Sequence, residues 1–202
     1  MDSDRRALQA PLTGAAAEPR LRSIGTDPAA FTEFYRAHVD EVTRFVTRRV
    51  ADPQLAADLT AEVFLAAIEA AARYRGSVGG PRTWLYGIAR HVIAAEFRRS
   101  ARERRAEGLI AGRRLLDADD VDRLVEKIDA SRRVRELHAE LQALPEGERA
   151  VLELVSVDGL TVAEAAAALG IRPVAARVRL HRARRALRPE SFRLIVETEV
   201  VS

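Results

Sequence analysis

Apolar residues recur at helical spacing in several separate segments, and no alternating strand pattern of useful length appears before residue 189. Two segments open with the same start signal, Asp27-Pro28 and Asp52-Pro53, in which a capping aspartate precedes a proline suited to a first helical turn. A third segment begins near Pro81. The apolar positions of these helices are Phe31, Phe34, Tyr35, Val42, Phe45, Val46 and Val50, then Leu55, Leu59, Val63, Phe64 and Ile68, then Trp84, Leu85, Ile88, Ala89, Val92, Ile93 and Phe97. The pattern predicts an all-α protein in which Trp84 anchors a core.

A helix-turn-helix is predicted near the C-terminus. Thr161 and Glu164 form a capping box, so a short helix should begin there. Gly170 suits the left-handed residue that ends such a helix, and Pro173 suits the first turn of a second one. In this second helix Ala176, Leu180, Ala183 and Leu187 form a narrow apolar stripe that should face the core.

The opposite face of that second helix points to a polyanionic ligand. Seven arginines and His181 lie between Arg172 and Arg188, with no acidic residue among them. An arginine can form two hydrogen bonds with guanine or bind phosphate, and a valine can meet a thymine methyl group. The alternative is a solvated basic face, but the cap, the glycine and the apolar stripe together favour DNA binding. The outward residues are Val174, Arg177, Val178, His181, Arg182 and Arg185.

A second basic face is predicted on the helix that begins near Pro81. It carries Arg82, Tyr86, Arg90, His91 and Arg98, a spacing that would track a nucleic-acid backbone and stack bases. For this face taken alone, a solvated surface is an equally good interpretation. The glycine-rich stretch before it, RGSVGGP at 75–81, lacks the ending of a phosphate-binding loop.

Composition excludes several other classes of protein. The 202 residues include no cysteine, which excludes disulfides and thiolate zinc sites, and the four histidines show no metal-ligand spacing. No catalytic constellation stands out either, so we expect no metal, no cofactor and no enzymatic activity. No apolar run is long enough to cross a membrane, and the N-terminus does not resemble a secretory signal. A cytoplasmic protein without membrane insertion is expected.

A shift in charge divides the chain. Acidic residues outnumber basic ones at 106–129, which indicates a linker between two small helical domains. Helices are then expected up to Pro145 and from Glu146 to about Val157. The expected parts are a disordered tail at 1–26, a domain at 27–105, the linker at 106–129, a domain at 130–188 and a tail of unassigned role at 189–202.

Separated segments of the chain together resemble one family. They are Asp58-Leu59-x-x-Glu62-x-Phe64, PRTWLYGIARHVIAAEFRR at 81–99, LPxxERAVLEL at 144–154, GLTVAEAAAALGI at 159–171 and VRLHRARRALR at 178–188. In order and spacing they resemble the small bacterial sigma factors of the extracytoplasmic-function group, or group four. This sequence departs from the usual pattern of the family at Ala61, His91, Ala95 and Val174-Ala175. We therefore assign it no consensus promoter sequence from the family.

The resemblance implies a transcription initiation factor with a region 2 domain and a region 4 domain. The first would dock on the clamp helices of the largest subunit of core RNA polymerase, through Asp58, Leu59, Glu62 and Phe64. The second would sit on the polymerase flap and contact the minus-thirty-five element through Arg172, Arg177, Val178, His181, Arg182 and Arg185. The minus-ten element would be melted and held by Arg75, Ser77, Arg82, Tyr86, Arg90, His91 and Arg98. Because anti-sigma control is common in the family, an anti-sigma partner is also implied.

A stand-alone helix-turn-helix regulator that binds operators as a dimer is the alternative. Such a regulator needs only the C-terminal motif. The polymerase-docking motif and the second basic face at Arg82 to Arg98 argue against it.

Overall fold

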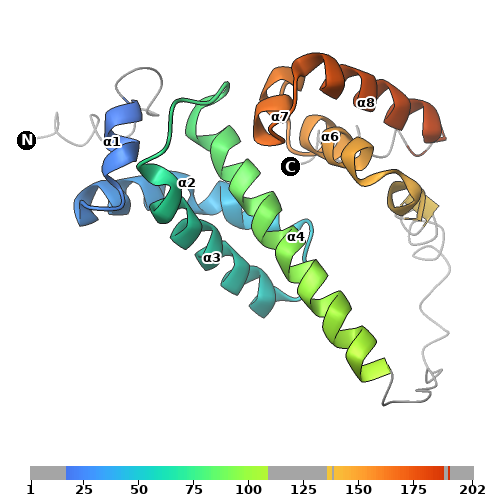
Figure 1. Cartoon of the computed structure of the whole chain (residues 1–202), viewed down its shortest axis with the longest axis horizontal. Coiled ribbons are helices and arrows are strands. Elements are labelled where there is room, and N and C mark those ends of the chain that lie inside the picture. Colours follow the sequence, from blue (N-terminus) through green and yellow to red (C-terminus); the bar gives the residue numbers. More distant parts are fainter. Residues whose placement is uncertain (1–16, 109–135, 138, 189–190, 192–202) are drawn as a thin grey trace, which may run out of the picture. The chain divides into compact units, whose positions relative to one another are not determined.

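The computed structural model describes residues 17–108, 136–137, 139–188 and 191, and every regular element among them is a helix. The chain divides into two compact units, residues 1–97 and 98–202. The elements, coloured along the chain in Figure 1, are α1 (Ala17–Ser23), α2 (Pro28–Thr47), α3 (Pro53–Ala71), α4 (Gly80–Gly108), α6 (Glu146–Ser156), α7 (Val162–Ala168) and α8 (Pro173–Ala186). The all-α prediction is confirmed.

Helices α2 and α3 begin where the sequence predicts. The Asp27 carboxylate accepts a hydrogen bond from the Ala29 amide at 2.9 Å, and the Asp52 carboxylate accepts one from the Gln54 amide at 2.9 Å. In each case a proline follows the capping aspartate, and its missing N–H leaves no donor unsatisfied in the first turn. These paired signals fix where both helices start.

Aromatic rings from α2, α3 and α4 form much of the core of the N-terminal unit. Phe34 packs edge-on against Phe64, and the ring of Trp84 lies edge-on to that of Tyr74 with centroids 5.1 Å apart. The prediction that Phe97 belongs to this core is wrong, because its side chain is 48% exposed.

Helix α1 corrects the prediction of a disordered tail at 1–26. Leu21 and Ile24 are each only 3% exposed, and α1 packs on α2 and α3. Residues 1–16 lie outside the described residues. The helix escaped prediction because its seven residues are too few to show a period.

The helix-turn-helix of the C-terminal unit is confirmed. The Thr161 amide donates to the Glu164 carboxylate at 2.7 Å, and the Glu164 amide donates to the Thr161 hydroxyl at 3.2 Å. Gly170 has φ +63°, the left-handed conformation that ends α7. Leu180 and its stripe partners are buried against α6 and α7, which holds α8 on the unit.

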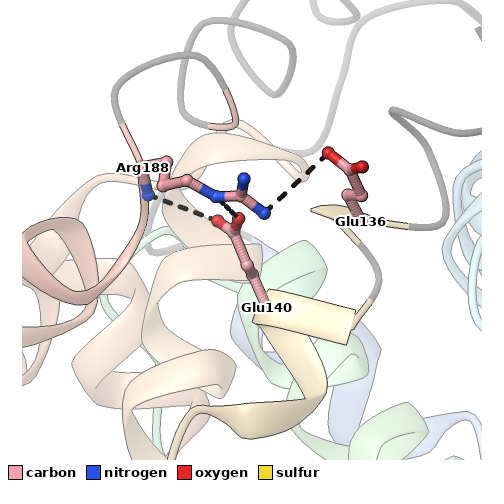
Figure 2. Close-up of polar contacts among 3 residues, drawn as sticks. All are labelled: Glu136, Glu140 and Arg188. Atoms are coloured by element: carbon pink, nitrogen blue, oxygen red, sulfur yellow. Dashed lines mark hydrogen bonds and ion pairs between the residues drawn. The ribbon is translucent and has the colours of Figure 1, made fainter. Parts of the chain in front are cut away.

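Helical residues at 136–137 and 139–143 precede Pro145. Figure 2 shows how this segment holds the end of α8: the Arg188 guanidinium donates to the Glu140 carboxylate and lies 3.9 Å from that of Glu136. The Arg188 amide also donates to Glu140 at 3.2 Å. The expected linker from residue 109 onward, and the tail apart from Ser191, lie outside the described residues.

Candidate nucleic-acid interface

The outward face of α8 is the clearest candidate surface for a ligand. Here the outward face means Val174, Arg177, Val178, His181, Arg182 and Arg185, all of which are exposed. Val174 is 65% and Val178 44% exposed, one helical turn apart. An exposed apolar side chain beside arginines is stabilised when it contacts an apolar group of a charged ligand, such as a thymine methyl in the major groove. This geometry matches the placement predicted from the sequence.

The arginines on α8 and just after its end divide into two groups. Arg188 is paired with Glu140, and the half-buried Arg179 packs over the start of α6, where an added Cβ at Gly147 would lie 3.1 Å from its guanidinium. Both side chains therefore serve the fold. Arg177 and Arg182 belong to the outward face and are exposed. The positive charge available to a ligand therefore comes from fewer than the seven arginines between Arg172 and Arg188.

The same contacts affect the pKa of Glu140. Partial burial of its carboxyl raises the pKa, but hydrogen bonds from Ser191 and from Arg188 outweigh that effect and lower the pKa below its ordinary value. The ionised carboxylate is therefore favoured in the folded protein. Its attachment to Arg188 ties the last residues of the helix-turn-helix to the segment before Pro145.

The basic face of α4 is only partly available. His91 and Arg98 are exposed and Arg90 is half-buried. Nδ1 of His91 lies 2.7 Å from the Gly87 carbonyl oxygen, to which it donates in the tautomer that carries the proton there. Arg82 is half-buried, and its guanidinium lies 3.9 Å from the Glu41 carboxylate of α2. The face is therefore built by two helices and carries both signs of charge.

The prediction that Tyr86 offers its ring on this face is wrong. Tyr86 is 4% exposed and stacks on Phe45 with ring centroids 4.4 Å apart, so no base can stack on it. Its hydroxyl instead accepts a hydrogen bond from Arg82 Nε at 3.3 Å. Tyr86 orients Arg82 from inside the core.

Glu41 helps to hold Arg82. The side-chain hydrogen bond with His38 is the main cause that lowers the Glu41 pKa, burial opposes it, and the charges of Arg82, His38 and Arg44 lower it further. The carboxylate therefore stays ionised beside Arg82. Sequence reasoning missed Glu41, because its partner lies on another helix.

The glycine loop, residues 75–81, leads into α4 and includes its first two residues. Gly76, Gly79 and Gly80 have φ of 76°, 83° and 70°, a left-handed conformation that other residues rarely adopt. Arg75 is exposed, Ser77 is half-buried, and Val78 is 59% exposed between the glycines. The loop thus presents a small apolar side chain and a cation next to the basic face of α4.

Helix α3 presents a different surface. Asp58 and Glu62 are exposed one turn apart, whereas Leu59 and Phe64 are buried. The polymerase contacts of these four residues stay a prediction, with only the two carboxylates exposed in the folded chain. Leu59 packs inward, whereas Phe64 borders the groove described next.

Beside these carboxylates lies an apolar groove that the sequence reasoning missed. It encloses about 420 Å³ between α2 and α3 and is lined by residues that include Phe31, Tyr35, Phe64 and Leu65. Leu65 is 61% exposed and falls three residues after Glu62. Because the helical period places both outward, the surface combines acidic and apolar groups.

The described residues also bear on metal binding and membrane insertion. Within the described ranges, no three His, Cys, Asp or Glu side chains come together in a group that could hold a metal ion. Among the same residues, no helix is both long and apolar enough to span a membrane.

Comparison with known families accounts for both units. Residues 34–103 match Sigma-70 region 2, and residues 134–187 match Sigma-70, region 4. These successive matches define the class, a bacterial sigma factor. The match to region 2 does not support a stand-alone helix-turn-helix regulator.

Curated relatives place the chain within that class. It is 38% identical over 164 residues to the probable RNA polymerase sigma-C factor of Mycobacterium bovis, an alignment that covers 78% of this chain and 81% of the relative. It is 29% identical over 152 residues to RNA polymerase sigma factor YlaC of Bacillus subtilis, covering 75% and 86%. A second 38% relative, from Mycobacterium tuberculosis, is an ECF RNA polymerase sigma factor, SigC. The chain belongs to the extracytoplasmic-function sigma factors of the sigma-70 family.

Solved structures agree on the fold. CnrH in complex with the cytosolic domain of CnrY aligns with a TM-score of 0.56 at 19% identity, covering 90% of this chain and 97% of that one. The sigma factor RpoE of Bartonella quintana, in complex with the anti-sigma factor NepR, aligns with a TM-score of 0.54 at 16% identity, covering 84% and 98%.

Proposed function

We propose that this protein binds core RNA polymerase and directs it to specific promoters, where it contacts both the minus-ten and the minus-thirty-five element. The observation that carries the proposal is the outward face of α8, where exposed arginines flank two exposed valines on a buried helix-turn-helix scaffold. The family of the chain supports the same function. The protein would work in the cytoplasm, where polymerase meets the chromosome, and the catalytic groups would all belong to polymerase.

The C-terminal unit would place α8 in the major groove of the minus-thirty-five element. Its N-terminal half carries Val174, Arg177 and Val178, the end of a recognition helix that approaches base edges. Arg172 at the N-cap is exposed and would contact phosphate. His181, Arg182 and Arg185 continue the face along the helix.

The N-terminal unit would hold the melted minus-ten strand. Arg75 and Ser77 lie in the glycine loop, and Arg82, Arg90, His91 and Arg98 follow on α4. The glycines let the backbone approach a strand closely, and the cations neutralise its phosphates. Tyr86 contributes indirectly, by orienting Arg82.

Polymerase would dock on α3. Asp58 and Glu62 supply negative charge, and Leu65 with the α2–α3 groove supplies apolar area, a combination that suits a partner with basic and apolar side chains. Leu59 would support α3 from the core, and Phe64 would contribute to the wall of the groove.

An anti-sigma protein is proposed as a second partner. RpoE, which shares the fold, was solved with the anti-sigma factor NepR bound, and CnrH was solved with the cytosolic domain of CnrY bound. The exposed apolar groove supports this proposal, since a surface of that kind is usually covered part of the time. Affinity purification of the full chain from its host tests it, and recovery of polymerase subunits alone would argue against it.

The test of the main proposal is run-off transcription with purified core polymerase and genomic DNA. Core polymerase with the full chain should give discrete promoter-specific transcripts that core polymerase alone does not. A double variant, Arg177→Ala with Arg182→Ala, should lose them, whereas Arg20→Ala, an exposed arginine of α1, should keep them. Identical transcripts with and without the protein would refute the proposal.

A further inference from the structure

We propose that Arg22, on α1, is a positioning residue that fixes the base of the glycine loop and so promotes opening of the minus-ten element. The inference rests on the proposed function of that loop. Helix α1 lies before residue 34, where the match to Sigma-70 region 2 begins, so the family assignment gives it no role.

The contact that carries the proposal spans 52 residues of sequence. Arg22 Nε donates a hydrogen bond to the carbonyl of Tyr74 at 2.8 Å, in a partly buried setting. Tyr74 comes three residues after α3 ends and immediately before Arg75, the first residue of the loop. A guanidinium is a strong, charged hydrogen-bond donor for a backbone carbonyl.

The donor is held in place by the packing of α1. Leu21 and Ile24, on either side of Arg22, are buried in the core of the unit. After α1 the chain passes close to α3 at Gly25, where an added Cβ would lie 3.1 Å from the Ile68 carbonyl oxygen. Only a residue without a side chain fits there without a shift of the backbone. The backbone that carries Arg22 is therefore held in place, and its exposed side chain reaches the loop from a fixed position.

The acceptor is fixed from the other side. The Tyr74 ring is buried and packs edge-on against Trp84, which lies in α4 directly after the loop. Tyr74 therefore contacts Arg22 of α1 through its carbonyl and Trp84 of α4 through its ring. The first residue of the loop leaves from this junction with a defined direction.

The loop itself needs such a fixed base. Gly76, Gly79 and Gly80 permit many backbone conformations, so ordering them costs more conformational entropy than ordering other residues. The Gly80 amide donates to the Ser77 carbonyl at 2.8 Å, a turn that depends on where the chain enters the loop. A loop that is already ordered captures an extruded base without a further ordering cost.

The experiment measures promoter opening by the full chain bound to core polymerase, with a fluorescent base analogue in the minus-ten strand of a promoter found by run-off transcription. Arg22→Ala should slow opening by about tenfold or more, the effect of losing one hydrogen bond from a charged donor, while initial binding to the duplex changes less than about twofold. Arg22→Lys, which keeps a cationic donor, should recover most of the rate.

Arg20→Ala is the matched control. It removes the same charge from the same helix, where Arg20 pairs with Glu33 on the surface, and should open promoters like the wild type. A second measurement needs no polymerase: hydrogen exchange of the Gly80 amide should speed up in Arg22→Ala, while amides in the middle of α2 keep their protection.

Each outcome decides the matter. Normal opening by Arg22→Ala, equal slowing by Arg20→Ala, or equal losses in initial binding and opening would overturn the positioning role and leave the proposed function standing. Failure of the wild type to open any promoter would overturn the proposed function itself, and this role with it.

Discussion

Only some of the arginines between Arg172 and Arg188 should set the salt dependence of promoter binding. Arg177 and Arg182 are exposed on the outward face, whereas Arg188 is held by Glu140 through its guanidinium and its backbone amide. Arg177→Ala and Arg182→Ala should each remove one interaction with a phosphate or a base edge. Arg188→Ala should remove none, because that side chain already has an anionic partner within the fold.

The magnitude follows from counterion release. Removing one arginine–phosphate interaction should reduce the slope of log affinity against log salt by about 0.9. Between about 50 and 200 mM salt, the fall in affinity should then be smaller by about threefold for each variant. Arg188→Ala should keep the wild-type slope but lower the thermal stability of the C-terminal unit, because it leaves the partly buried Glu140 carboxylate without its cation.

The assay is binding of the holoenzyme to a labelled promoter fragment across a salt series, with the same polymerase preparation for every variant. Thermal unfolding of each free variant serves as the control for folding. An unchanged slope together with an unchanged site preference in Arg177→Ala and Arg182→Ala would show that these side chains do not contact DNA. A reduced slope in Arg188→Ala would refute the division of the arginines.

Three further predictions concern other residues. If Val178 meets a thymine methyl, replacing that thymine by uracil should weaken wild-type binding by about threefold to tenfold and leave Val178→Ala unaffected, as measured on single-substituted promoters. The folded pKa of Glu140 lies below its ordinary value of 4.5, so its ionised carboxylate stabilises the folded protein above pH 4.5, and this stabilisation is lost as pH falls through the folded pKa. The free energy of unfolding of Glu140→Gln, measured against pH, should lack this dependence. Parallel curves of unfolding free energy against pH for the two proteins would contradict the prediction. Asp58→Lys with Glu62→Lys should weaken assembly with core polymerase by about tenfold or more in a pull-down without affecting folding, since both side chains are exposed.

Local signals in the sequence are enough to predict most helices and the face of α8. The capping residues Asp27, Asp52 and Thr161 act on amides two or three residues away, so their effect can be read from neighbouring letters. The stripe from Ala176 to Leu187 is periodic, so the opposite face follows directly.

Interactions between distant residues cannot be read in the same way. Spacing by four from Arg82 and Arg90 puts Tyr86 on the basic face, but stacking on Phe45 of α2 turns its ring inward. Arg188 belongs by sequence to the basic run of α8, yet its partner Glu140, 48 residues away in sequence, holds it within the fold. Helix α1 and the hydrogen bond from Arg22 to Tyr74 depend on tertiary packing for the same reason.

In the proposed function one chain binds a promoter at two places, through separate units. Nuclease footprinting combined with permanganate detection of unpaired thymines, on one promoter bound by the holoenzyme, tests both contacts together. With the wild type we expect an upstream protected segment and a downstream melted segment. Arg177→Ala with Arg182→Ala should weaken the upstream protection first, while promoters that remain bound still melt downstream. Upstream protection that survives this double variant unchanged would contradict binding of the minus-thirty-five element by α8.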